Sequence, residues 1–166
     1  PATNMTVTAV WMINQYIISF DENGADGTIP VTIIKKYGTS IDLPDVGNLI
    51  KIGHSFKGWA FDVDGDTVVY EAGATFNIPA SNVRFIAVWT INQYTITFDS
   101  AGGTDVNPIK QDYGTSVTAP ADPTREGFVF MGWNQTVPEI MPAENLDFLA
   151  IWEYPIVGGK EGMWNK

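Results

Sequence analysis

Apolar and polar residues alternate along several short stretches of the chain, with the period of two that is typical of β-strands. Tyr94, Ile96 and Phe98 alternate with threonines, and apolar residues share one face between Leu146 and Trp152. The same patterns occur in the first half of the chain. The 16 Gly and 10 Pro residues interrupt any longer periodic stretch. The pattern therefore predicts a mainly β fold with little helix.

One closing phrase occurs three times and divides the chain. The phrase begins with Pro-Ala, has Asn at its fourth position and ends on Trp, and it occupies residues 1–11, 79–89 and 142–152. The last two copies follow a shared order of motifs, which are Ile-Asn-Gln-Tyr, Phe-Asp, Tyr-Gly-Thr-Ser and Gly-x-x-Phe-x-Gly-Trp. Such self-similarity indicates tandem modules. It predicts the closing strand of a truncated preceding repeat at 1–12, repeat modules at 13–90 and 91–153, and a tail outside the pattern at 154–166.

Residues that tolerate positive φ follow each opening strand. They are Asn23-Gly24 in the first repeat and Gly102-Gly103 in the second, and they predict a sharp turn into a hairpin. The first repeat also has a longer loop, in which Asp64-Gly65 predicts a hairpin that runs from Phe61 to Tyr70.

Large aromatic residues recur at the same positions of the repeats. A residue that recurs at one strand position is most simply a packing anchor that fills a thin core, although six Trp residues in one chain also fit a stacking platform for sugars or bases. Trp164 stands outside the pattern and has no assigned role. The predicted anchors are Trp11, Trp59, Trp89, Trp133, Trp152, Phe20, Phe98, Phe56 and Phe130.

The order of these motifs over about 150 of the 166 residues resembles the Listeria–Bacteroides repeat family. The resemblance implies small β-grasp-like modules, found in tandem in secreted or wall-attached bacterial surface proteins as stalks or interaction segments. It therefore implies an extracellular or cell-surface location, with neighbouring repeats or domains as partners. The chain departs from its own pattern at Ile78, where the second copy has Met141, and at His54, where it has Phe128.

The charge and composition exclude several functional classes. With 19 acidic and 9 basic residues the net charge is −10 and the isoelectric point is about 4.3, so the chain repels nucleic acid. The absence of Cys excludes disulfide scaffolds and thiolate zinc sites. No apolar run reaches the length of a membrane span, and no signal peptide opens the chain.

Three alternating carboxylates lie in the longer loop of the first repeat. Asp62, Asp64 and Asp66 are the residue type that calcium prefers. The EF-hand pattern, however, requires Gly at the sixth position and Glu at the twelfth, and this chain has Thr67 and Gly73 there. We therefore expect an exposed hairpin without a bound metal or other cofactor, and keep calcium as the alternative.

Two functional hypotheses remain open from the sequence. The first is a non-enzymatic stalk or spacer of a surface protein, with an adhesion or protein-interaction role. The second is a module that binds a glycan or a host protein through loop 60–77, with or without calcium. An enzyme is not expected, because the sole histidine, His54, replaces an aromatic residue in a strand and no nucleophile motif accompanies it.

The first repeat phrase also predicts an unpaired strand. Met5, Val7, Ala9 and Trp11 form an apolar stripe. Unpaired strands are templates for other sheet edges. We expect residues 5–11 to add to an exposed edge, either in the same chain or in a neighbouring molecule.

Overall fold

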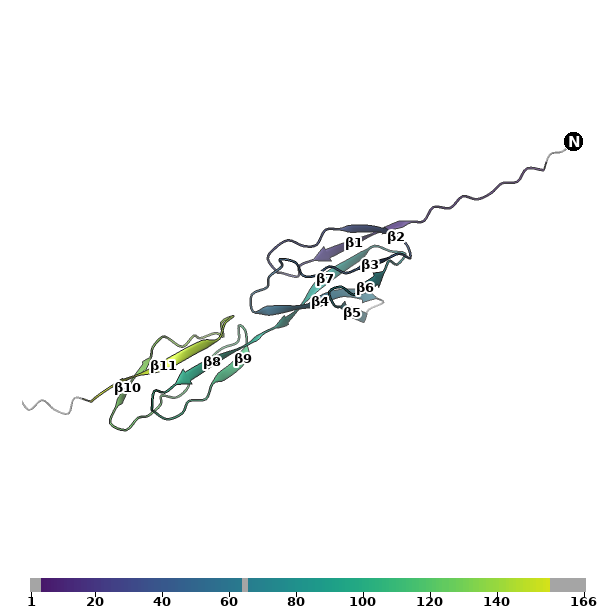
Figure 1. Cartoon of the computed structure of the whole chain (residues 1–166). Coiled ribbons are helices and arrows are strands. Elements are labelled where there is room, and N and C mark those ends of the chain that lie inside the picture. Colours follow the sequence, from purple (N-terminus) through teal and green to yellow (C-terminus); the bar gives the residue numbers. More distant parts are fainter. Residues whose placement is uncertain (1–3, 64–65, 156–166) are drawn as a thin grey trace, which may run out of the picture. The chain divides into compact units, whose positions relative to one another are not determined.

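A computed structural model describes residues 4–63 and 66–155 (Figure 1). The contacts divide the chain into two compact units on either side of Thr90 and Ile91. No residue in the described ranges is helical. The first unit contains β1 (Gln15–Asp21), β2 (Ile33–Lys36), β3 (Ser40–Asp42), β4 (His54–Val63), β5 (Asp66–Tyr70), β6 (Thr75–Asn77) and β7 (Val83–Ile91). The second contains β8 (Gln93–Asp99), β9 (Ile109–Asp112), β10 (Val129–Trp133) and β11 (Leu146–Glu153).

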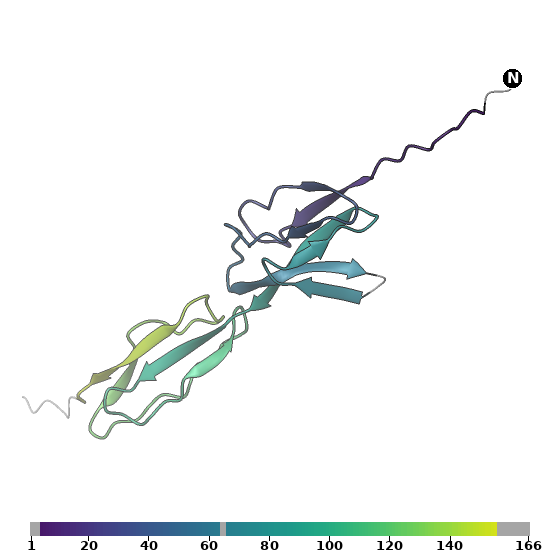
Figure 2. The same ribbon diagram turned by 45° about the vertical axis from the view of Figure 1, so that its right-hand side comes forward.

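The two units share one strand order (Figure 2). The first unit has a five-stranded sheet in the order β2-β1-β7-β4-β5 and a small sheet of β3 and β6. The second has a four-stranded sheet in the order β9-β8-β11-β10, which corresponds strand by strand to β2-β1-β7-β4. The opening and closing strands lie side by side and parallel in the middle, with Phe20 opposite Phe85 and Phe98 opposite Phe148. This arrangement confirms the predicted mainly β, β-grasp-like module.

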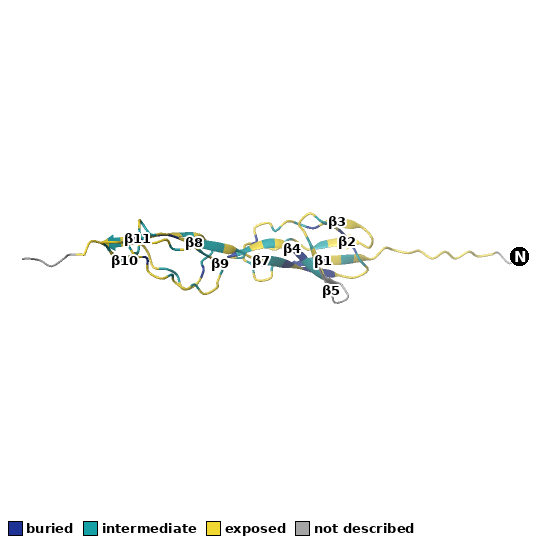
Figure 3. Cartoon of the chain, turned by 90° about the horizontal axis from the view of Figure 1, so that it is seen from below, coloured by how far each residue is buried: buried dark blue, intermediate teal, exposed yellow. Residues whose placement is uncertain are grey.

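One face of each sheet carries the core, because buried and exposed residues alternate along its strands; Figure 3 colours the buried residues dark blue. Alternate residues of the parallel strands are buried, including Ile18 and Phe85 in the first unit and Ile96 and Phe148 in the second. Irregular segments rather than helices cover this face, and they contribute residues such as Leu43 at 2% exposure; in the first unit Ile41 of β3 and Phe76 of β6 join them. Burial of apolar side chains on one face explains the period-two pattern of the sequence.

A β-bulge explains the Phe-x-Gly-Trp motif. In a regular strand Phe130 and Trp133, an odd number of residues apart, would face opposite sides of the sheet. The register between β10 and β11 shifts between Phe130 and Gly132. As a result both rings lie on the same side of the sheet, with centroids 5.3 Å apart. The matching pair in β4, Phe56 and Trp59, has a separation of 5.2 Å.

The turn after each opening strand differs in part from the prediction. Asn23 and Gly24 have positive φ, as expected. In the second unit, however, the positive φ angles lie at Ala101 and Gly102, one residue earlier than predicted. The expected tight hairpin is wrong, because the strand that pairs with β1 begins only at Ile33. After the first turn the chain forms an antiparallel bridge between Asp26 and Ile50 instead.

Replacing Ala101 should stabilise the second unit. Ala101 has a φ of 50°, a conformation that is unfavourable for a residue with a Cβ and no polar side chain. We expect Ala101→Asn, which introduces the residue found at position 23, to raise the free energy of unfolding of this unit by about 1 kcal/mol. Thermal unfolding measures the change. Ala101→Val serves as the control and should destabilise the unit. Changes of the same sign in the free energy of unfolding of both variants would contradict the assigned effect of the positive φ.

The amino-terminal segment does not behave as predicted within this chain. Residues 4–12 pair with none of the described strands, so addition to an edge of the same chain is wrong. Trp11 is 88% exposed and is not a core anchor. The physical reason is that the 166 residues contain no body of a preceding repeat, and the matching Trp89 packs on Phe56 of its own unit. Addition to a neighbouring molecule stays a prediction.

Candidate functional site

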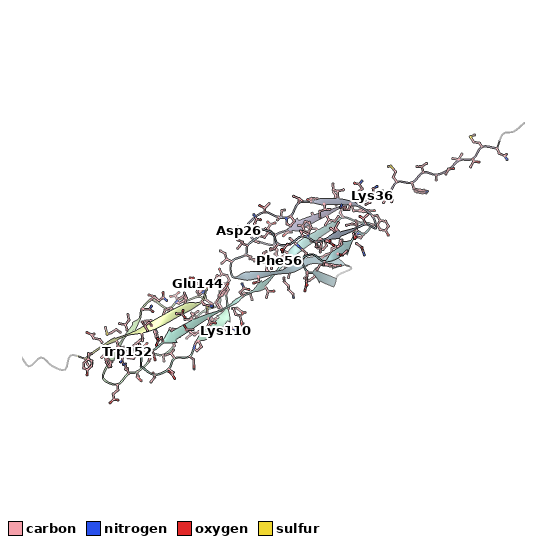
Figure 4. All side chains as sticks on the ribbon, in the orientation of Figure 1. Asp26, Lys36, Phe56, Lys110, Glu144 and Trp152 are labelled. Atoms are coloured by element: carbon pink, nitrogen blue, oxygen red, sulfur yellow. The ribbon has the colours of Figure 1, made fainter. Side chains whose placement is uncertain are left out.

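The repeated aromatic residues lie in or beside the two cores. Trp59, Phe20 and Phe98 are buried, at 0%, 6% and 9% exposure. Phe56, Trp89 and Trp133 are half-buried and pack against the core of their own unit. Phe130 and Trp152 are also half-buried, and their ring centroids lie 5.4 Å apart. Figure 4 labels Phe56 and Trp152.

Three of the Trp indoles donate hydrogen bonds inside their own unit. The Trp89 Nε1 donates to the Glu22 carbonyl at 3.1 Å, and the Trp152 Nε1 donates to the Ser100 carbonyl at 2.8 Å. These bonds fasten each closing strand to the turn that follows the opening strand. Trp59 Nε1 donates to the Pro44 carbonyl at 2.8 Å. The indoles thus satisfy backbone groups of the module, which is the role of a packing anchor rather than of a ligand platform.

The Asn in the closing phrase has a function that the motif pattern did not predict. The Ile17 N–H donates to Asn82 Oδ1 at 2.9 Å, and the Thr95 N–H donates to Asn145 Oδ1 at 2.8 Å. Both bonds join the start of the closing strand to the opening strand, across 65 and 50 residues of sequence. The signal was present, since Asn4 occupies the same position in the first phrase.

Removing one of these Asn side chains should weaken its unit. We expect Asn145→Ala to lower the free energy of unfolding of the second unit by about 0.5–1.5 kcal/mol, because the Thr95 N–H loses its acceptor. Thermal unfolding measures the loss. Asn145→Asp retains an acceptor oxygen and should restore most of the stability, whereas equal losses in both variants would contradict the assigned bond.

The two arms of the hairpin predicted between Phe61 and Tyr70 are present in the structure. β4 and β5 pair antiparallel up to Val63 and Asp66. Asp64 and Gly65 lie outside the described residues, as do the side chains of Asp62 and Asp66. Among the residues that the structure describes, no group of three His, Asp or Glu side chains could hold a metal ion.

The calcium alternative has a direct test. We expect millimolar calcium to leave the melting temperature of the chain unchanged, because the ligand set of the loop is incomplete. A rise of several degrees that disappears in Asp64→Ala would establish a calcium site instead. Magnesium at the same concentration is the ionic-strength control.

The first unit has a hollow of about 580 Å³ beside β4 and β7. Residues that line it include Asn23, Lys51, His54, Arg84, Ile86 and Val88. His54 is half-buried at the start of β4, and its Nδ1 lies 2.8 Å from the Ile52 carbonyl oxygen. This contact is consistent with a structural role for His54. The hollow also brings together two cationic side chains that are far apart in the sequence.

The turn after β1 fastens both cationic side chains. Arg84 forms a salt bridge with one carboxylate oxygen of Asp21, and the other oxygen accepts the Asn23 N–H at 2.8 Å. Lys51 Nζ donates to the Asn23 carbonyl at 2.9 Å. The Asn23 side chain donates to the Ala87 carbonyl at 2.9 Å and so ties the turn to β7. Sequence patterns could not reveal this site, because Lys51 and Arg84 belong to different elements.

Comparison with known proteins identifies the module. The model of the Listeria-Bacteroides repeat domain family matches residues 16–88 and 94–150. A Gly-rich membrane protein of Evansella cellulosilytica is 39% identical over 92% of this chain and 19% of its own length. Internalin H of Listeria monocytogenes is 35% identical over 50% of this chain and 14% of its own length.

A second membrane protein of Evansella cellulosilytica is 35% identical over 79% of this chain and 19% of its own length. Among solved structures, SHIRT domains 3–4 of a streptococcal cell surface protein align with 84% of this chain and 98% of their own, at 19% identity and a TM-score of 0.27. No helix in the described part of the chain is long and apolar enough to cross a membrane. The family match covers both structural units, and the chain therefore belongs to the Listeria-Bacteroides repeat domain family.

Proposed function

We propose that this chain is a non-enzymatic stalk segment of a bacterial secreted or cell-surface protein, in which each repeat module adds length between other parts of that protein. The observation that carries the proposal is the connection between the modules. β7 ends at Ile91 and β8 begins at Gln93, so a single residue separates the last strand of one module from the first strand of the next. Flexible linkers are longer and rich in Gly and Ser.

The relatives support an origin in a larger surface protein. The chain spans about a fifth of the length of the two Evansella relatives, which are named as membrane proteins, and the Listeria relative is an internalin. Repeat arrays place their modules in series, so the length of the array follows the number of copies.

The motif residues support a non-enzymatic role. In the two complete copies, the recurring Trp, Phe and Asn side chains pack in or beside a core or bond to the backbone of their own unit. A side chain with such a role in both complete copies needs no substrate to explain its recurrence. The motif residues that define the family in this chain thus form and stabilise the module.

Small-angle scattering on arrays of one, two and three copies of residues 13–153 tests the stalk proposal. A stalk gives a radius of gyration that rises nearly in proportion to the number of copies. A flexibly jointed array gives a rise closer to the square root of that number, and this result would contradict the proposal. Circular dichroism of each array confirms that the added copies are folded.

A binding role is the second candidate function, and the hollow of the first unit favours it. An adhesion or protein-interaction role needs at least one surface feature that an inert spacer would lack. The hollow has the volume of an ordinary ligand pocket, and two of its lining residues, His54 and Arg84, are replaced in the second copy by Phe128 and Asp147.

A further inference from the structure

We propose that the hollow of the first unit binds an acidic peptide segment of a partner protein, with a carboxylate on Lys51 and Arg84 and an aliphatic side chain on Ile86 and Val88. The site lies within the first unit, beside β7 and the start of β4, and it is independent of the stalk role. Its four residues come from β7 and from the segment before β4.

The cationic groups are held in place before a ligand arrives. Asp21 accepts from both Arg84 and the Asn23 backbone, and Asn23 in turn accepts from Lys51. One short turn therefore holds both cations. Lys51 Nζ has three protons and donates one of them to Asn23, and the Arg84 guanidinium has five N–H groups, so each retains donors for a ligand carboxylate. Groups held in this way lose little conformational entropy on binding.

The second unit lacks this arrangement at the matching positions. Arg125 stands in place of Lys51, and its guanidinium carbon lies 4.0 Å from the centroid of the Phe128 ring. Phe128 stands in place of His54 and packs on Tyr154, with ring centroids 5.1 Å apart. Asp147 stands in place of Arg84 and bonds to the Thr97 hydroxyl. The second unit thus keeps one cation, which packs on an aromatic ring, and has an acidic residue in place of the other.

The lining of the hollow indicates the class of ligand. Two cations beside one anion leave a local excess of positive charge, in a chain whose net charge is −10. Carboxylates are the natural partners of Lys and Arg in such sites. The adjoining wall is aliphatic, with Ile86 at 39% exposure. A peptide that alternates acidic and branched aliphatic residues provides both contacts.

Titration of the ¹⁵N-labelled chain with the acetylated, amidated peptide Gly-Glu-Leu-Glu-Val-Gly tests the proposal. We expect saturable shifts of the amide signals of Lys51, Arg84 and Ile86, without matching shifts at Arg125, Asp147 and Leu149 of the second unit. The peptide with Gln in place of both Glu residues should bind at least tenfold more weakly, because it offers no carboxylate. Equal binding of both peptides would overturn the proposal.

Variants assign the contacts. Lys51→Gln and Arg84→Gln should each weaken binding about tenfold, and Arg125→Gln, at the matching position of the second unit, should leave it unchanged. His54→Phe introduces the residue of the second unit and should narrow the hollow and weaken binding. Thermal unfolding separates these effects from loss of fold. Binding that survives both Lys51→Gln and Arg84→Gln overturns the proposal, as does a stronger response to glucuronic acid than to the acidic peptide.

Discussion

Replacing Trp59 with Ala is expected to unfold the first unit at physiological temperature. Trp59 is 0% exposed, and its ring packs on Phe20 and Phe56 with centroids 4.9 and 5.2 Å away. The variant also leaves the Pro44 carbonyl without the indole N–H. Replacing a buried Trp with Ala costs about 3–5 kcal/mol, which is comparable with the lower range of stability of a small domain.

Thermal unfolding of the Trp59→Ala variant, followed by the amide signals of each unit, measures this effect. The signals of the second unit should persist when those of the first have lost their dispersion. Trp133→Ala is the matched control, since Trp133 holds the same motif position but is half-buried, and its cost should be smaller and confined to the second unit. A Trp59→Ala variant that loses less than about 1 kcal/mol would contradict its role as the central anchor.

The second large effect is expected at Gly58. Gly58 has a φ of +151°, and a Cβ placed there would lie 2.3 Å from the Tyr70 carbonyl oxygen. That oxygen belongs to the backbone of β5, so the clash requires the strand to move. Gly58→Ala therefore combines backbone strain of about 1–3 kcal/mol with an overpacking cost of about 1–3 kcal/mol.

Gly132 provides the matched control for this prediction. It occupies the same motif position and has a φ of +118°, but no atom of the described residues would lie within 4 Å of a Cβ added there. Gly132→Ala should therefore lower the free energy of unfolding of the second unit by the strain alone, about 1–3 kcal/mol. Chemical denaturation measures the free energy of unfolding of both variants. Equal losses of this free energy in Gly58→Ala and Gly132→Ala would show that β5 does not restrict position 58.

Much of the secondary structure follows from local patterns. The alternation around Phe20, Phe85, Phe98 and Phe148 predicted strands with one buried face, because a strand places alternate residues on opposite sides. Gly and Asn predicted a turn after each opening strand, since they tolerate positive φ. The motif order also implied the repeat family, which the comparison confirms. These properties depend on residues that are close together in the sequence.

Tertiary structure decided the properties that depend on distant partners. Hydrophobic period indicates which face of a strand is buried but not which strand lies beside it, so the parallel pairing of Phe20 with Phe85 was not predicted. Nor was the bulge that turns Phe130 and Trp133 to one side. The hollow forms only because Asn23, Lys51 and Arg84 come together from three separate segments. Trp11 shows that a motif position alone does not bury a side chain. It occupies the same position of the closing phrase as the anchors Trp89 and Trp152, but it is exposed because these residues include no repeat body for it to pack on.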